Sequence, residues 1–318
     1  MQKLVIDSYG ADIGDEAIIR GTLKALERHT EYGAVIVGNR KSFEKCLSDW
    51  SVDISRLELE ETDNYVRNDE SPMSVFNGRE NASVCIAMDR LKNDDDCFSC
   101  LSPGNTGALF VASMTRLGLE KGIKSPVLAS SIPKPDGNWF CLLDCGASLS
   151  CTENDLVKFA HLGSDFAKRC YSIPAPKVGL LSNGRESTKG TELIKKTNAL
   201  LSESDLNFVG NVESYDLFTD YVDVVVADGF CGNLLLKTIE ATASSIMRVL
   251  SGVEKQYPSD YKDVFDTVNE AIAEKYELNV RGGAFFLGTK KPIIKMHGCS
   301  TEDTVGYCID QLIRLDMN

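Results

Sequence analysis

Short apolar runs recur along the chain, and each run ends in a polar turn that contains glycine and precedes a helix-like segment. The runs are continuous stretches of Val, Ile and Leu, which is typical of strands buried on both faces of a parallel sheet. The segments after them repeat apolar residues every three or four positions, as amphipathic helices do. The predicted strands cover residues 4–7, 34–37, 97–101, 139–144, 178–181, 224–228 and 293–296.

This alternation predicts an α/β fold, a three-layer sandwich around a mostly parallel sheet. The carboxyl ends of parallel strands lie at one edge of a sheet, so the glycine turns are expected to converge there. Ligands of open α/β sheets bind at this edge, where helix N-termini offer free N–H groups and a positive dipole end to anions. We therefore expect the functional residues in the turns.

The composition narrows the class of protein. With 34 Lys and Arg against 47 Asp and Glu, the net charge of −13 argues against nucleic-acid binding and against strong attraction to anionic membranes. The eleven cysteines are an odd number scattered through apolar runs, which favours reduced thiols in a cytoplasmic protein over a disulfide framework. No apolar stretch is long enough to predict a spanning helix.

The spacing of the glycines excludes several nucleotide-binding motifs. No two of the 25 glycines stand two positions apart, so the dinucleotide fingerprint GxGxxG is absent, and the Walker pattern is absent as well. No GxSxG elbow or HExxH zinc motif occurs, and the chain has only three histidines to act as bases. The spacing of Cys97 and Cys100 on a strand disfavours a shared metal ion. We expect no cofactor and no metal.

Anion binding with little covalent chemistry remains. The segment Gly104, Asn105, Thr106 and Gly107 opens a helix directly after a strand, where its backbone could approach an anion and its side chains could cap the helix. A purely structural turn with a good cap explains the same spacing. The polar segment over residues 60–72 is expected to be a surface loop, with a lid as the less favoured alternative.

Four further residues stand in comparable turns. Lys189 is predicted at the start of a helix, where the dipole disfavours a cation and an anionic ligand would compensate. Asp228 and Asn233 flank another turn, and Asp228 could equally well serve its own backbone. His297 ends an apolar strand, where it is either a buried structural histidine or a proton donor.

With these turns identified, the chain resembles the bacterial phosphate acyltransferases of phospholipid synthesis, the PlsX family. The similar segments occur in family order over nearly the whole chain, and together they are specific although each alone is weak. They cover residues 7–12, 104–109, 144–147, 189–193, 207–213, 223–233, 282–288 and 297–298.

The resemblance implies one α/β domain over residues 1–318, similar to isocitrate and isopropylmalate dehydrogenases, with a helical dimer-forming extension at about 234–278. It implies a homodimer that converts acyl-acyl carrier protein (acyl-ACP) and inorganic phosphate into acyl phosphate and free carrier. An apolar stripe over 235–253 fits a core or dimer face, and the acidic segment 254–277 implies at most weak peripheral membrane contact.

The resemblance also implies site residues. Lys189 would stabilise phosphate and transition-state charge, Asn233 would donate to the carbonyl or orient phosphate, and His297 would protonate the departing thiolate. The residues implied to bind substrate or phosphate are Asp7, Gly10, Asp12, Gly104, Asn105, Thr106, Gly107, Gly146, Glu186, Asp228 and Gly229.

The chain departs from the family pattern at seven positions: Tyr9, Ala11, Asn77, Arg79, Ser148, Ser150 and Arg185. These departures keep two alternatives open. The first is a related phosphotransacylase that uses a CoA thioester or another protein-bound thioester. The second is a catalytically silent homologue that binds an acyl carrier. A dehydrogenase on the same scaffold is the least favoured alternative.

Overall fold

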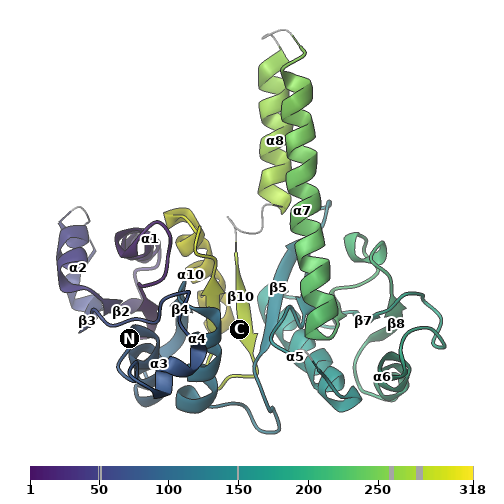
Figure 1. The fold of residues 1–318 in the computed structure, drawn as a ribbon, viewed down its shortest axis with the longest axis horizontal. Helices are drawn as coiled ribbons and strands as arrows, with labels where there is room; N and C mark the ends of the chain where they lie inside the picture. Colours follow the sequence, from purple (N-terminus) through teal and green to yellow (C-terminus); the bar gives the residue numbers. More distant parts are fainter. Residues whose placement is uncertain (49, 51, 149, 258–260, 277–281, 318) are drawn as a thin grey trace. The chain divides into compact units, whose positions relative to one another are not determined.

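The computed structural model describes the whole chain except residues 49, 51, 149, 258–260, 277–281 and 318. The chain divides into two compact units. Unit 1 comprises residues 1–126 and 279–318, and unit 2 comprises residues 127–278. Each unit has its own strands and its own covering helices (Figure 1). Each is described by itself.

The strands of unit 1 lie in the order β3-β2-β1-β4-β11-β10. All neighbours pair in parallel except β10, which runs antiparallel to β11. β1 and β2 are almost completely buried, which explains why their apolar runs do not alternate. The bounds are β1 Lys3–Asp7, β2 Gly33–Gly38, β3 Leu57–Glu61, β4 Cys97–Ser102, β10 Gly283–Leu287 and β11 Ile293–Met296.

Helices cover both faces of the unit 1 strands (Figure 1). One face carries α1 (Asp15–Arg28), α2 (Arg40–Leu47) and α10 (Glu302–Met317). The other face carries α3 (Ser83–Asn93) and α4 (Thr106–Ala112). This is the predicted arrangement of helix, sheet and helix layers.

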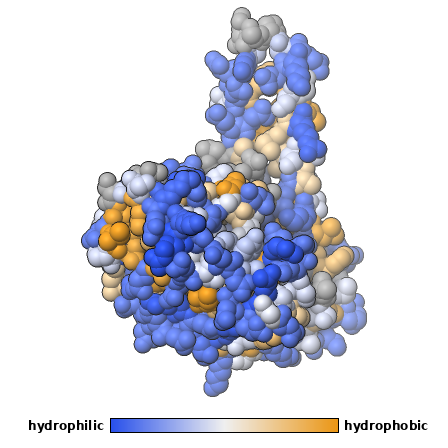
Figure 2. Space-filling model, turned by 60° about the vertical axis from the view of Figure 1, so that its left-hand side comes forward, coloured by the Kyte–Doolittle hydropathy of each residue, from blue (hydrophilic) through white to orange (hydrophobic). Residues whose placement is uncertain are grey.

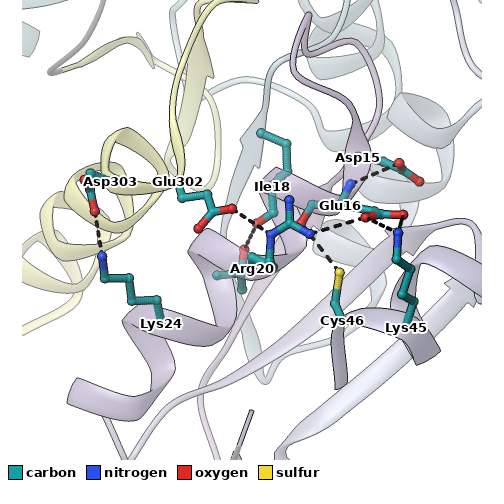
Figure 3. Close-up of polar contacts among 10 residues, drawn as sticks. Asp15, Glu16, Ile18, Arg20, Lys24, Lys45, Cys46, Glu302 and Asp303 are labelled. Atoms are coloured by element: carbon teal, nitrogen blue, oxygen red, sulfur yellow. Dashed lines mark hydrogen bonds and ion pairs between the residues drawn. The ribbon is translucent and has the colours of Figure 1, made fainter. Parts of the chain in front are cut away.

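Ion pairs join the helices of the first face (Figure 3). Arg20 of α1 donates to Glu302 of α10 at 2.6 Å, and Lys24 of α1 donates to Asp303 at 2.8 Å. Glu16 of α1 accepts from Lys45 of α2 at 2.8 Å. These pairs are partly exposed, so each contributes little alone, but together they fix how α1 lies between its neighbours.

The strands of unit 2 lie in the order β5-β6-β9-β7-β8. β5 and β6 are antiparallel, and the remaining pairs are parallel. The strands are β5 Val127–Pro133, β6 Trp139–Leu143, β7 Val178–Leu181, β8 Phe208–Val212 and β9 Val224–Val226; the helices are α5 Glu153–Tyr171, α6 Glu192–Ser202, α7 Gly229–Glu254 and α8 Lys262–Tyr276.

Alternation along the strands assigns α5 and α7 to opposite faces of unit 2. Gly163 of α5 lies against Leu143 and Val224, whereas Leu142 and its neighbours form a buried cluster with Leu236 of α7. Successive strand residues point to opposite faces, so both faces of this sheet are also covered.

The apolar stripe predicted on α7 divides into two parts. Leu235 and Ile239 pack against the buried cluster of unit 2, whereas Ile246 and Val249 are 47% and 65% exposed. Figure 2 shows hydrophobic patches on the α7–α8 helix pair beside a mostly hydrophilic surface. Part of the predicted acidic segment, residues 258–260 and 277, lies outside the described residues. None of the described helices combines the length and apolarity needed to span a membrane.

All seven predicted strands are present with nearly the predicted bounds, whereas β3, β5, β8 and β10 were not predicted. All eleven cysteines are free thiols. Two expectations were wrong. α6 begins at Glu192 with Thr191 as its N-cap, so Lys189 precedes the helix and is not in its first turn, because Gly190 adopts a positive φ of 90°. The polar segment over 60–72 begins as the end of β3, and it is a loop only after Glu61.

Candidate functional site

Three loops of unit 1 meet at the carboxyl ends of β1, β4 and β11. Gly10 (φ 102°) lies so close to the second loop that a Cβ there would stand 2.5 Å from the Cα of Gly104. The N–H of Asp12 donates to the carbonyl of Gly298 in the third loop at 2.7 Å. The expected convergence of glycine turns is therefore present within this unit.

Asp7 is the buried carboxylate at this convergence. It ends β1, it is 1% exposed, and its Oδ2 accepts a hydrogen bond from Ser102 Oγ at 2.7 Å. The same hydroxyl accepts from the N–H of Gly104 at 3.1 Å. Burial raises the pKa of Asp7 to about 6, although the hydrogen bonds from Ser102 and Ser83 favour the charged form.

Lys295 was missed by sequence reasoning. Its Nζ donates to the carbonyl of Pro103 at 3.1 Å and to that of Met296. Burial lowers the pKa of Lys295 to about 8, and the charges of Asp7 and Asp12 work in the opposite direction. The available signal was a single lysine inside the apolar run 293–296.

The side chain of Asn105 serves the protein itself. Its Oδ1 caps α4 by accepting from Ala108 N at 2.9 Å, and its Nδ2 donates to the carbonyls of Arg67 at 3.0 Å and Glu70 at 3.3 Å. Asn105 thus caps α4, as the structural alternative predicted, and its amide group holds the polar loop after β3. Thr106 is exposed beside it, and Gly107 is needed because a Cβ would meet Pro72 at 2.4 Å.

A cleft of about 490 Å³ adjoins the converging loops of unit 1. One wall consists of Tyr9 and Tyr65, whose rings stack at 4.7 Å with an angle of 7°. The hydroxyl of Tyr9 donates to the carbonyl of Thr62 at 3.1 Å, which fixes the ring. The charged residues of the lining are Asp12, Asp15 and Arg67. His297 lies half-buried at the end of β11, next to Gly298.

A second buried carboxylate, Asp144, follows β6 in unit 2. Its Oδ1 accepts from the N–H groups of Gly146 at 3.1 Å and Ala147 at 3.0 Å, and its Oδ2 accepts from Ser148 N at 2.7 Å and from Ser148 Oγ. A Cβ on Gly229 would meet Asp144 Oδ2 at 2.8 Å. Asp144 thus packs its own turn against the start of α7.

The first turn of α7 carries the other predicted residues of this group. Asp228 is the N-cap, and its Oδ1 accepts from Phe230 N at 3.0 Å and Cys231 N at 2.9 Å. Asn233 is exposed, and the ideal Cβ position of Gly146 (φ 127°) lies 3.5 Å from its Cβ. The Asn233 amide has no hydrogen-bond partner among the residues described, so it can bind a ligand.

Lys189 and Glu186 lie in the loop between β7 and α6. Both are exposed, and both cover Gly184, where a Cβ would stand 2.8 Å from Lys189 Cγ and 3.0 Å from Glu186 Oε2. Asn211 Nδ2 donates to the carbonyl of Glu186 at 2.9 Å and so holds the loop on β8. Within the described part of the chain, Lys189 forms no ion pair, which leaves its ammonium for an anion.

Two departures from the family pattern have structural roles in unit 2. Arg185 pairs with the buried Asp216 and lies 5.4 Å from the ring centre of Tyr221. The hydroxyl of Ser148 donates a hydrogen bond to Asp144. Both substitutions satisfy a buried carboxylate, and they leave the neighbouring Lys189 and Asn233 exposed.

The predicted site residues form one group in unit 1 and two groups in unit 2. The structure brings Asp7, Gly10, Asp12, Gly104 and the His297 loop together in unit 1. In unit 2 it brings Gly146, Gly229 and Asn233 together, and it places Glu186 beside Lys189. No cluster of His, Cys, Asp and Glu side chains suited to a metal ion occurs among the described residues. The chemistry available is charge stabilisation by ammonium and amide groups.

Comparisons with known proteins agree with this chemistry. A family model described as fatty acid synthesis protein matches residues 2–317. The phosphate acyltransferase of Streptococcus equi subsp. equi is 37% identical over 324 residues, covering 98% of this chain and 93% of the relative. That of Bacillus cereus is 34% identical over 314 residues, covering 97% of this chain and 93% of the relative.

Solved structures share the fold. A phosphotransacetylase from Streptococcus pyogenes matches with a TM-score of 0.63 at 12% identity, covering 99% of this chain and 94% of that one. A branched-chain phosphotransacylase from Enterococcus faecalis matches with a TM-score of 0.60 at 15% identity, covering 99% of both chains. At these identities the likeness supports the α/β fold alone.

The raised pKa of Asp7 predicts a pH-dependent stability. Its folded-state pKa of about 6 lies above the ordinary value of 3.8, so between these values the folded protein holds a proton that the unfolded chain has released. Stability from this group is therefore lost as pH rises through about 6. Between pH 5 and pH 7.5, the free energy of unfolding of wild type should fall by about 1 kcal/mol more than that of Asp7→Asn.

Urea unfolding at both pH values measures this difference. Asp95→Asn is the control, because that carboxylate is exposed and its removal should leave the pH dependence of wild type. If the free energy of unfolding of Asp7→Asn changed with pH as much as that of wild type, the raised pKa of Asp7 would be contradicted.

Proposed function

The chain belongs to the fatty acid synthesis protein family, and we propose that this acyltransferase moves the acyl group of acyl-ACP to inorganic phosphate, giving acyl phosphate and free carrier. The observation that carries the proposal is the identity of 37% and 34% to phosphate acyltransferases over nearly the whole chain. The exposed Lys189 ammonium and Asn233 amide support it, because this reaction needs charge stabilisation and no cofactor.

In the proposed reaction, a phosphate oxygen attacks the thioester carbonyl carbon. The new C–O bond forms, the C–S bond breaks with its electron pair on sulfur, and a proton from His297 neutralises the thiolate. Lys189 stabilises the phosphate charge, and Asn233 donates to the carbonyl oxygen as it becomes an oxyanion.

The remaining roles are binding and positioning. Backbone N–H groups around Asn105 to Gly107 contact phosphate, and the buried Asp7 holds this turn through Ser102, which accepts from the N–H of Gly104. The other proposed substrate- or phosphate-binding residues are Gly10, Asp12, Asn105, Thr106, Gly146, Glu186, Asp228 and Gly229.

A direct assay tests the reaction and its donor. Purified protein, inorganic phosphate and acyl-ACP should yield acyl phosphate, measured as a hydroxamate after hydroxylamine trapping, and an acyl-CoA of the same chain length should react more slowly. Product from acyl-CoA alone would favour the alternative phosphotransacylase. Turnover on neither donor, with acyl-ACP still bound, would favour the silent homologue.

The exposed lysine before α6 gives a second test. Lys189→Ala should lower acyl-phosphate formation by roughly 100- to 1000-fold, because it removes one charged donor to the transition state. Its thermal midpoint should stay near wild type, since the side chain is exposed and unpaired among described residues. Lys195→Ala is the matched control, because Lys195 lies on α6 and its ammonium pairs with the exposed Glu192 of the same helix. Equal rates for both variants would refute the role of Lys189.

We also propose a homodimer formed through α7. Its outer half exposes Ile246 and Val249 along a groove of about 580 Å³, and a second copy presenting the same face would bury both surfaces. Val249→Glu should shift sedimentation from dimer to monomer, whereas Thr267→Glu on α8 should leave the dimer intact. A monomeric wild type would contradict this assignment.

We place the enzyme in the cytoplasm, with at most weak peripheral contact with membranes. The net charge of −13 opposes binding to anionic lipid headgroups, and weak binding should be visible as poor co-sedimentation with anionic liposomes at physiological salt.

A further inference from the structure

Lys295 belongs to a row of polar side chains that crosses three adjacent strands of unit 1. In the parallel pairing of β11 with β4, Lys295 stands opposite Ser102. In the pairing of β1 with β4, Ile6 stands opposite Leu101, so Asp7 follows at the level of Ser102. Residues at one level of neighbouring strands share a face. The ammonium, the hydroxyl and the carboxylate therefore lie together at the carboxyl ends.

This row holds the Gly104 turn from both sides. On one side Lys295 Nζ donates to the carbonyl of Pro103 at 3.1 Å, and on the other side the hydroxyl of Ser102 accepts from Gly104 N at 3.1 Å. An ammonium has three N–H donors. Besides the carbonyls of Pro103 and Met296, the residues that the structure describes offer it no further hydrogen-bond acceptor. One donor is thus left for a ligand.

The ammonium also balances the charge of the surrounding loops. Asp7 and Asp12 both act on Lys295 electrostatically. Inorganic phosphate is an anion at neutral pH, so two carboxylates without a cation would repel it from these loops. With Lys295 in place, a positive charge stands in the same row as Asp7 and offsets part of this negative charge.

We propose that Lys295 is the positioning residue for phosphate: it fixes the Gly104 turn and compensates Asp7, so that the converging loops of unit 1 accept the anion. Only the identity of the anion rests on the proposed function. The contacts of Lys295 with the Gly104 turn involve residues of unit 1 alone and do not depend on it.

Lys291 provides a matched control on the same segment. Its Nζ donates to the carbonyls of Leu91 at 2.7 Å, Asp94 at 2.9 Å and Cys97 at 2.6 Å, at the amino end of β4 and away from the loops. Its three donors are all used by the protein. Loss of Lys291 should therefore cost stability without affecting phosphate.

Steady-state kinetics separate the two lysines. Lys295→Met and Lys295→Gln should raise the KM for phosphate by roughly 10- to 100-fold, the usual effect of losing a charged hydrogen bond, while the KM for the acyl donor stays within about twofold. Glutamine keeps a donor for the Pro103 carbonyl and tests the charge alone. Lys291→Met should lower the thermal midpoint and leave the KM for phosphate at its wild-type value.

A binding measurement is independent of turnover. Added inorganic phosphate should raise the thermal midpoint of wild type and Lys291→Met, and it should have little effect on either Lys295 variant. This outcome with no acyl-phosphate formation would refute the proposed reaction and retain the role of Lys295. Phosphate stabilisation equal in wild type and Lys295→Gln, or absent in wild type, would overturn the role of Lys295.

Discussion

A buried carboxylate at the end of a strand organises the functional loops of each unit. Asp7 in unit 1 and Asp144 in unit 2 are almost completely buried, and each accepts hydrogen bonds from a serine hydroxyl and from backbone N–H groups of nearby turns. A buried charge without such donors is costly, so the turns must fold around the carboxylate. Their glycines follow from this constraint, because a Cβ on Gly229 would collide with Asp144.

The positive groups of the site are few, and their surroundings differ. The protein carries a net charge of −13, yet the proposed reaction requires it to hold an anion. Lys189 is exposed on a loop that Asn211 anchors, so its charge is available to a ligand. Lys295 is partly buried and donates to the carbonyl of Pro103, in the turn that Asp7 holds through Ser102. The Lys189 ammonium can thus contact the substrate directly, whereas Lys295 holds the loops that bind it.

Much of the fold could be predicted because buried parallel strands leave continuous apolar runs. β1, β2 and β11 are found where these runs predicted them. The glycine turns after β1, β4 and β11 of unit 1 also meet as expected, and so do those after β6 and β9 of unit 2. The position of Lys189 was predicted less well, because Gly190 and Thr191 together delay the start of α6.

The roles of Asn105 and Lys295 could not be inferred from local sequence. Asn105 binds carbonyls more than thirty positions away, and Lys295 reaches Pro103 only because β11 pairs with β4. Both contacts are products of tertiary structure. The close approach of Gly10 to Gly104 has a related evolutionary consequence. The loop after β1 cannot acquire a side chain at position 10 without displacing the backbone of Gly104, so variation in the adjoining cleft is confined to other positions of its lining, such as the aromatic wall of Tyr9 and Tyr65.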